Sequence, residues 1–151
     1  MTGLAAVVRT LAVALWIGGM AALDFIEAPL RFSTPALDRN QAVALGQAAF
    51  ARFNRVEAAL GVIALAAAIA ARSARWTVAV AAIMLALVLV QTLYLTPEIT
   101  RLAAGLDFVN RAAGDPRYAA IRSLHNVYAA AEIAILAGGV AVLAGWAASA
   151  R

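Results

Sequence analysis

The chain has 151 residues, of which 65% are hydrophobic and 13% charged, and its formal net charge is +4. A soluble domain of this length is closer to half apolar, so the composition excludes an ordinary soluble protein and indicates one membrane domain. The basic residues are all arginines and lie mostly at the ends of apolar runs, which fits contact with anionic lipid headgroups. Because no basic face with interleaved aromatic residues occurs, we expect no nucleic-acid partner.

The first apolar run extends from Leu4 to Leu23 and is interrupted only by Arg9 and Thr10. Its length matches the roughly 20 residues that cross the hydrocarbon core of a bilayer. We interpret it as a first transmembrane helix, about residues 4–27, rather than as a cleaved signal peptide.

A polar connection follows, in which the Ser-Thr-Pro sequence at 33–35 breaks the chain. Asp38, followed three residues later by Gln41, is typical of a capping box. We therefore predict an amphipathic helix that begins near Arg39 and runs on toward the second span.

The second apolar run, residues 58–71, has only fourteen residues, which is too short to cross the membrane alone. A span from about 53 to 71 would be long enough. The basic connection at 72–75 is too short for anything but an antiparallel partner, so we predict a third span at 76–95 that returns beside the second.

The second long connection begins with Thr96, Pro97 and Glu98, which is typical of a helix N-cap followed by proline. Apolar residues then recur on one face, and we expect this amphipathic helix to end near Gly114. Asp115 and Pro116 repeat the cap-and-proline pattern and precede a fourth span at about 121–148.

These elements predict an all-α integral membrane protein with a single domain over residues 1–151. We expect an antiparallel four-transmembrane-helix bundle with amphipathic surface helices in the two long connections. A multi-pass protein of a bacterial inner membrane is the expected location.

In such a bundle the ends of spans one and three lie at the same depth as the starts of spans two and four. Ionisable residues at this depth are costly, usually turn inward, and are candidates for function. The candidate ligand- or ion-binding residues are therefore Asp24, Glu27, Glu57, His125, Tyr128 and Glu132, with Gln91, Tyr94 and Asn126 as secondary candidates.

His125, the only histidine, and Glu132 are seven residues apart, which places them about 20° apart on one helix face and roughly 10 Å apart along the axis. Glu132 lies near the predicted bilayer midplane. A carboxylate at that depth must be protonated, or paired with a cation or several donors.

Simpler interpretations remain open for several of these residues. Asp24 and Glu27 can both form ion pairs with Arg31, which is four residues beyond Glu27. Glu57 can complement the dipole at the start of the second span. His125 can be a hydrogen-bonded structural residue, and the tryptophans, Trp16 among them, are interpreted as interface anchors or packing residues.

The residue inventory also limits the chemistry. With no cysteine and one histidine, disulfides, Fe–S clusters, thiolate copper and bis-histidine haem are disfavoured. A hard or borderline cation held by Asp24, Glu27, Glu57 and His125 stays open, so the metal and cofactors are unknown. No nucleophilic triad, phosphate-binding glycine loop or dinucleotide motif occurs, so the sequence leaves an enzyme open but favours a protein that is not one.

Three stretches carry a resemblance to a known family: LWIGGMAALDFIEAPLRF, AAFARFNRVEAALG and DPRYAAIRSLHNVYAAAEIAIL. Together they resemble the domain-of-unknown-function 4149 group, which includes the vertebrate transmembrane protein 205, over nearly the whole chain. The resemblance implies a four-span membrane protein of unassigned activity. The shared polar and aromatic positions it implies are Asp24, Pro29, Phe32, His125 and Glu132; the family often has serine at the position of Tyr128.

The leading functional hypothesis is a non-enzymatic membrane module that binds a small ligand, ion or lipid headgroup in a polar pocket between the helices. The alternatives are an accessory or structural subunit of a larger membrane complex and a proton- or cation-coupled transporter. The expected partners are the lipid bilayer, together with a small ligand or other membrane subunits, including further copies of this chain.

Overall fold

The computed structural model describes residues 2–112 and 114–149, and within them the chain is helical, with no β-strand. The helical segments follow one another along the chain as α1 (Thr2–Ala22), η1 (Leu23–Glu27), α2 (Ala28–Ser33), α3 (Arg39–Ala70), α4 (Arg75–Val90), η2 (Gln91–Leu95), α5 (Thr96–Ala103) and α6 (Pro116–Ser149). The two η segments are single stretches of π-helix inside longer helices.

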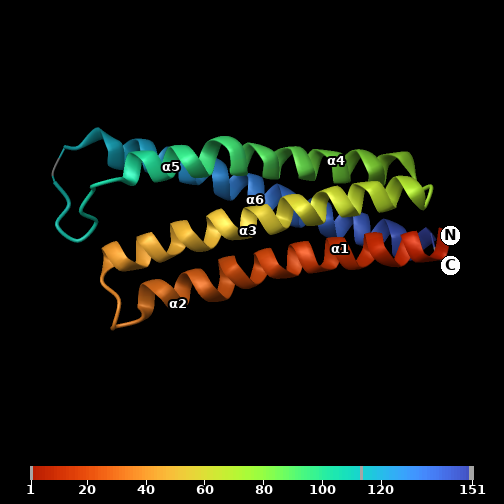
Figure 1. Ribbon diagram of the computed structural model, residues 1–151, viewed down its shortest axis with the longest axis horizontal. Coiled ribbons are helices and arrows are strands. Elements are labelled where there is room, and N and C mark those ends of the chain that lie inside the picture. The colour runs from red at the N-terminus through yellow and green to blue at the C-terminus, as the bar shows by residue number, and fades with distance from the viewer. Residues whose placement is uncertain (1, 113, 150–151) are drawn as a thin grey trace.

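Among the residues that the structure describes, four continuous helices are long and apolar enough to cross a membrane: Gly3–Ser33, Arg39–Ala70, Arg75–Ala103 and Pro116–Ala148. α3 packs on α1 and α4, and α6 packs on α4 and α1, so the four helices close into a bundle. Figure 1 shows the helices running alternately in opposite directions, with both chain ends at one end of the bundle. The predicted antiparallel four-span fold is confirmed.

The centre of the bundle combines large and very small side chains. Trp16, Met20, Met84 and Ile135 are almost completely buried in one apolar cluster. Gly61 lets the helices approach here, because a Cβ at this position would lie 2.9 Å from Leu85 Cδ1 and 3.1 Å from the Trp16 ring. Many apolar side chains on the outside of the bundle are exposed, as expected where lipid is the solvent.

The helix α3 begins where the sequence predicts. Asp38 Oδ1 accepts a hydrogen bond from the backbone N–H of Gln41 (2.8 Å), and Gln41 Oε1 accepts one from the N–H of Asp38 (2.9 Å). This capping box satisfies two donors that the helix itself leaves unpaired. From Arg39 the amphipathic segment continues into the second span without a break.

Two prolines are accommodated by π segments rather than by helix ends. Pro29 and Pro97 each follow a five-residue π segment. At the end of each segment a backbone N–H donates to the carbonyl five residues earlier: Ala28 N–H to the Leu23 carbonyl, and Thr96 N–H to the Gln91 carbonyl. Proline lacks an N–H and clashes with the carbonyl four residues earlier, and the wider π turn relieves both problems. The predicted helix start at Thr96 was therefore wrong, because the third span runs through it.

The amphipathic α5 ends at Ala103, earlier than the predicted Gly114, and a loop follows it. Asn40 of α3 donates to Asp107 Oδ1 (3.0 Å) and accepts from the backbone N–H of Phe108 (2.6 Å). Tyr118 donates its hydroxyl to the carbonyl of Asp107 (2.5 Å). The two long connections are thus joined through polar groups at the end of the bundle away from the chain termini.

Candidate functional site

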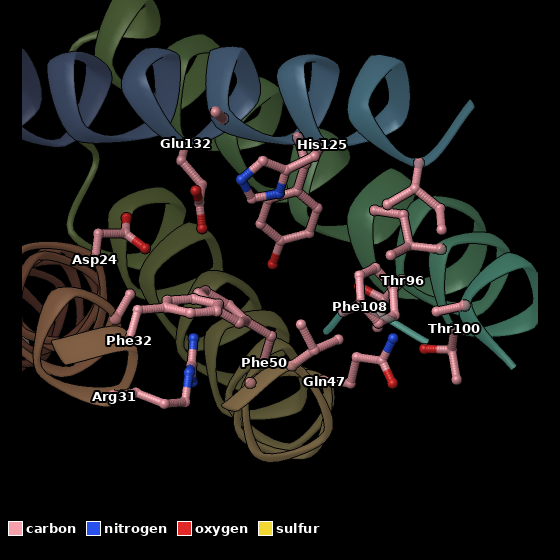
Figure 2. Close-up of a pocket in the computed structure, with 18 of the residues that line it drawn as sticks. Asp24, Arg31, Phe32, Gln47, Phe50, Thr96, Thr100, Phe108, His125 and Glu132 are labelled. Carbon is pink, nitrogen blue, oxygen red and sulfur yellow. The ribbon is translucent and has the colours of Figure 1, made fainter. Parts of the chain in front are cut away.

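A cavity of about 480 Å³ lies between η1, α2, α3, α5 and α6, in the half of the bundle away from the termini. Its walls are mainly apolar and include four phenylalanines. The polar and charged residues of the lining are Asp24, Arg31, Gln47, Thr96, Thr100, His125, Tyr128 and Glu132. Figure 2 shows Asp24, Arg31 and Glu132 reaching the same space from η1, α2 and α6.

Two carboxylates face each other across this space. Asp24 comes from the π segment η1 and Glu132 from the middle of α6, and both point into the cavity (Figure 2). Both residues are half-buried, and within the described part of the chain neither carboxylate has a hydrogen-bond or ion-pair partner. We call Asp24 and Glu132 the cavity carboxylates.

Arg31 lines the opposite wall with only 5% of its surface exposed. Its Nη1 donates to both carboxylate oxygens of Glu27, at 2.9 and 2.8 Å, which confirms the interpretation of Glu27 as an ion-pair partner. The guanidinium carbon lies 5.3 Å from the centre of the Phe32 ring and 6.0 Å from that of Phe50. The positive charge of Arg31 is therefore already neutralised inside the protein.

The place of Arg31 depends on a glycine. A Cβ at Gly46 would lie 2.8 Å from Arg31 Cζ, so only glycine leaves room for the guanidinium against α3. From the sequence, Arg31 was expected only as an ion-pair partner of Asp24 and Glu27; the pair with Asp24 was wrong, because Arg31 bonds to Glu27. No pattern in the sequence indicates that Arg31 points into a cavity.

A chain of hydrogen bonds holds the remaining wall in place. The Tyr128 hydroxyl donates to Asn54 Oδ1 (2.7 Å), and Asn54 Nδ2 donates to Thr96 Oγ1 (2.9 Å), which joins α6, α3 and α5. The Phe50 and Tyr128 rings pack edge to face with centroids 5.9 Å apart. Asn54 is completely buried and was missed by the sequence analysis, although an asparagine inside a membrane helix is itself a signal.

Glu57 lies outside the cavity lining. Since α3 begins at Arg39, Glu57 is deep inside the helix, and the interpretation as a helix-start charge was wrong. It is 3% exposed, and its Oε1 accepts a hydrogen bond from Trp16 Nε1 (3.0 Å). Glu57 therefore joins α3 to α1 in the core, and Trp16 is a core packing residue, not an interface anchor.

The secondary candidates are dispersed. Gln91 is 1% exposed and donates to the carbonyl of Tyr128 (3.4 Å), behind the cavity wall. Tyr94 is 60% exposed, and Asn126 is also exposed; neither belongs to the lining. The structure thus brings Asp24, His125, Tyr128 and Glu132 together around one space, and their role in binding stays a prediction.

The comparisons with known proteins give a family. A family model described as a domain of unknown function (DUF4149) matches residues 11–106. The chain belongs to the DUF4149 family. No curated protein and no solved structure matches this DUF4149 protein. The match includes the segments that carry Asp24 and Arg31, whereas α6, with His125 and Glu132, lies beyond the matched residues.

A metal centre is not assembled in the described part of the DUF4149 protein, where no three His, Cys, Asp or Glu side chains come together as ligands. Glu27 is engaged by Arg31, and Glu57 by Trp16. The cation site suggested for Asp24, Glu27, Glu57 and His125 is therefore wrong in its residue set.

The cavity has a size and a lining that are common among small-molecule sites. Small-molecule sites are concave, mostly apolar, a few hundred Å³ in volume, and carry a few polar groups at fixed positions. The cavity of the DUF4149 protein has this volume, an aromatic lining, and polar groups supplied by η1, α2, α3, α5 and α6.

Proposed function

We propose that this DUF4149 protein is a non-enzymatic, multi-pass membrane module that binds a small ligand in the cavity between its helices. The observation that supports this function is the pair of cavity carboxylates, Asp24 and Glu132, pointing from different helices into one space of about 480 Å³. We place it in a bacterial inner membrane on the basis of its apolar α-helices and its alanine- and arginine-rich composition.

Energetics favour a ligand over a purely structural role for these two groups. An ionised carboxylate at this depth of a membrane protein costs free energy unless it is protonated or paired, whereas an alanine carries no such cost. Elsewhere in the protein this cost is met internally, as for Glu27 with Arg31 and Glu57 with Trp16. At the cavity, a bound molecule would supply the missing partner.

The direction of Glu132 separates this function from that of an accessory subunit. If Glu132 paired with a polar group of another membrane protein, it would have to be presented on the outer surface of α6. Instead it is half-buried and lines the cavity, whereas the outer surface of α6 presents apolar residues such as Val127 and Val140.

Native mass spectrometry of protein released directly from its own membranes tests the proposal. We expect the wild-type protein to carry a bound small molecule and Ala129→Phe, which fills the cavity without changing charge, to have lost it. Val140→Phe is the matched control, because Val140 lies on the same helix but is 60% exposed. If the wild-type protein carries no bound molecule, or if Ala129→Phe carries it to the same extent, ligand binding in this cavity is disproved.

A further inference from the structure

The charges around the cavity distinguish between ligand classes. Arg31 already pairs with Glu27 through its Nη1, and an anionic ligand at the remaining guanidinium nitrogens would also face the two cavity carboxylates. A neutral ligand would leave both carboxylates without a charged partner. A cation is attracted by both groups and needs no existing ion pair to break.

The apolar lining sets a second requirement. Phe25, Phe32, Phe50 and Phe108 surround the space together with aliphatic residues of α5 and α6. A small inorganic cation would leave these walls unfilled, whereas an organic cation can bury an apolar body against them. Aromatic faces also attract ammonium groups directly.

The cavity also has an opening on the side of the bundle. α2 packs on α3, but within the described residues no Cα of η1 or α2 lies within 8 Å of a Cα in α6. The lining residues on the two sides of this gap include Phe25, 70% exposed, and Ile133, 68% exposed. Apolar side chains exposed on the flank of a membrane bundle face lipid, so the gap connects the cavity with the bilayer.

We propose that the cavity admits an amphiphilic ammonium cation sideways from the bilayer, between η1–α2 and α6. The ammonium nitrogen lies between Asp24 and Glu132, and the apolar body lies against the phenylalanines. This inference rests on the proposed function and names its ligand class. A free alkylamine and the headgroup of an aminophospholipid share this chemistry.

A binding assay on the full chain in uncharged maltoside micelles tests the charge requirement. Decylamine, which is protonated at neutral pH, is compared with decanol, which has the same chain without the charge. Wild type is expected to bind decylamine about tenfold or more tightly than decanol, as for a charge-assisted contact. The comparison of the two ligands uses only the wild-type protein, so it does not depend on whether any variant folds.

Variants locate the binding site. Asp24→Asn and Glu132→Gln keep side-chain size, and each is expected to weaken decylamine binding by about tenfold while leaving decanol binding unchanged. Glu98→Gln is the control, because Glu98 pairs with Arg101 and does not line the cavity. If decanol binds wild type as tightly as decylamine, or both carboxylate variants bind decylamine normally, the cation inference is overturned.

The assay also separates this inference from the proposed function. If decanol and decylamine bind equally and Ala129→Phe abolishes both, the cavity binds ligands but does not select cations. If Ala129→Phe changes neither, both proposals fail. Competition by phosphatidylethanolamine, but not by phosphatidylglycerol, would identify the lipid headgroup as the source of the ammonium, and lack of competition would identify a free amine.

Discussion

The indole nitrogen of Trp16 donates a 3.0 Å hydrogen bond to the carboxylate of Glu57, in the core between α1 and α3. This contact explains how a glutamate is tolerated in the middle of a membrane helix without lining the cavity. It also distinguishes Glu57 from Glu132, which has no such donor among the described residues.

Trp16→Phe should destabilise the protein by about 1–3 kcal/mol beyond the packing change, because it leaves a buried acceptor without its donor. Unfolding monitored by circular dichroism in mixed micelles would measure the loss. Trp76→Phe is the control, since Trp76 is 49% exposed and packs on Gly145, so this variant should lose packing only. An equal loss in both variants would contradict the role given to the Trp16–Glu57 hydrogen bond.

Gly46→Ala should disturb the cavity wall. The new methyl group would lie 2.8 Å from Arg31 Cζ, so the guanidinium must move and weaken its bonds to Glu27. We expect a loss of about 1–3 kcal/mol in the free energy of unfolding. Gly18→Ala is the matched control, because nothing lies within 4 Å of its added Cβ, and helix propensity should make it neutral or stabilising by about 1 kcal/mol. Equal stability of the two variants would show that Arg31 does not need this space.

The loop after α5 should become less stable in acid. Hydrogen bonds from Asn40, Asn110 and Val109 hold the pKa of Asp107 well below its usual range. A carboxyl whose pKa is lowered by folding contributes stability above its unfolded pKa of about 4, and this contribution declines as the pH falls toward the lowered value.

The midpoint of thermal unfolding should therefore fall more between pH 7 and pH 3 for wild type than for Asp107→Asn. The amide variant cannot titrate, so its curve reports the remaining acidic groups. An identical pH dependence of the two proteins would show that Asp107 does not stabilise this loop through its charge.

The side opening of the cavity can be tested with a spin label at Ile133→Cys, because the chain has no other cysteine to react. Ile133 lines the cavity and is 68% exposed, so we expect dissolved oxygen, which concentrates in lipid, to relax the label more than a water-soluble nickel chelate. A label at Arg72→Cys, in the connection between α3 and α4, should show the opposite preference. Strong nickel relaxation at residue 133 would mean that the cavity opens to water there.

Local sequence patterns predicted those features that depend on neighbouring residues. The Asp38–Gln41 capping box and the Glu27–Arg31 ion pair follow from spacings of three and four residues on one helix. His125 and Glu132 were placed on one face of the fourth span, and both line the cavity. The same reasoning failed at Thr96, because a π segment carries the helix through the following proline.

The sequence alone determined the four spans and their antiparallel order, because hydropathy and rise per residue are properties of each helix by itself. Only the tertiary structure decided how each helix is rotated about its axis. Each π segment adds a residue to its turn and so rotates the following side chains by about 100° relative to a regular helix. That rotation and the packing between helices place Arg31 against Gly46, bury Asn54 behind the wall, and leave Asp24 facing Glu132 across the cavity.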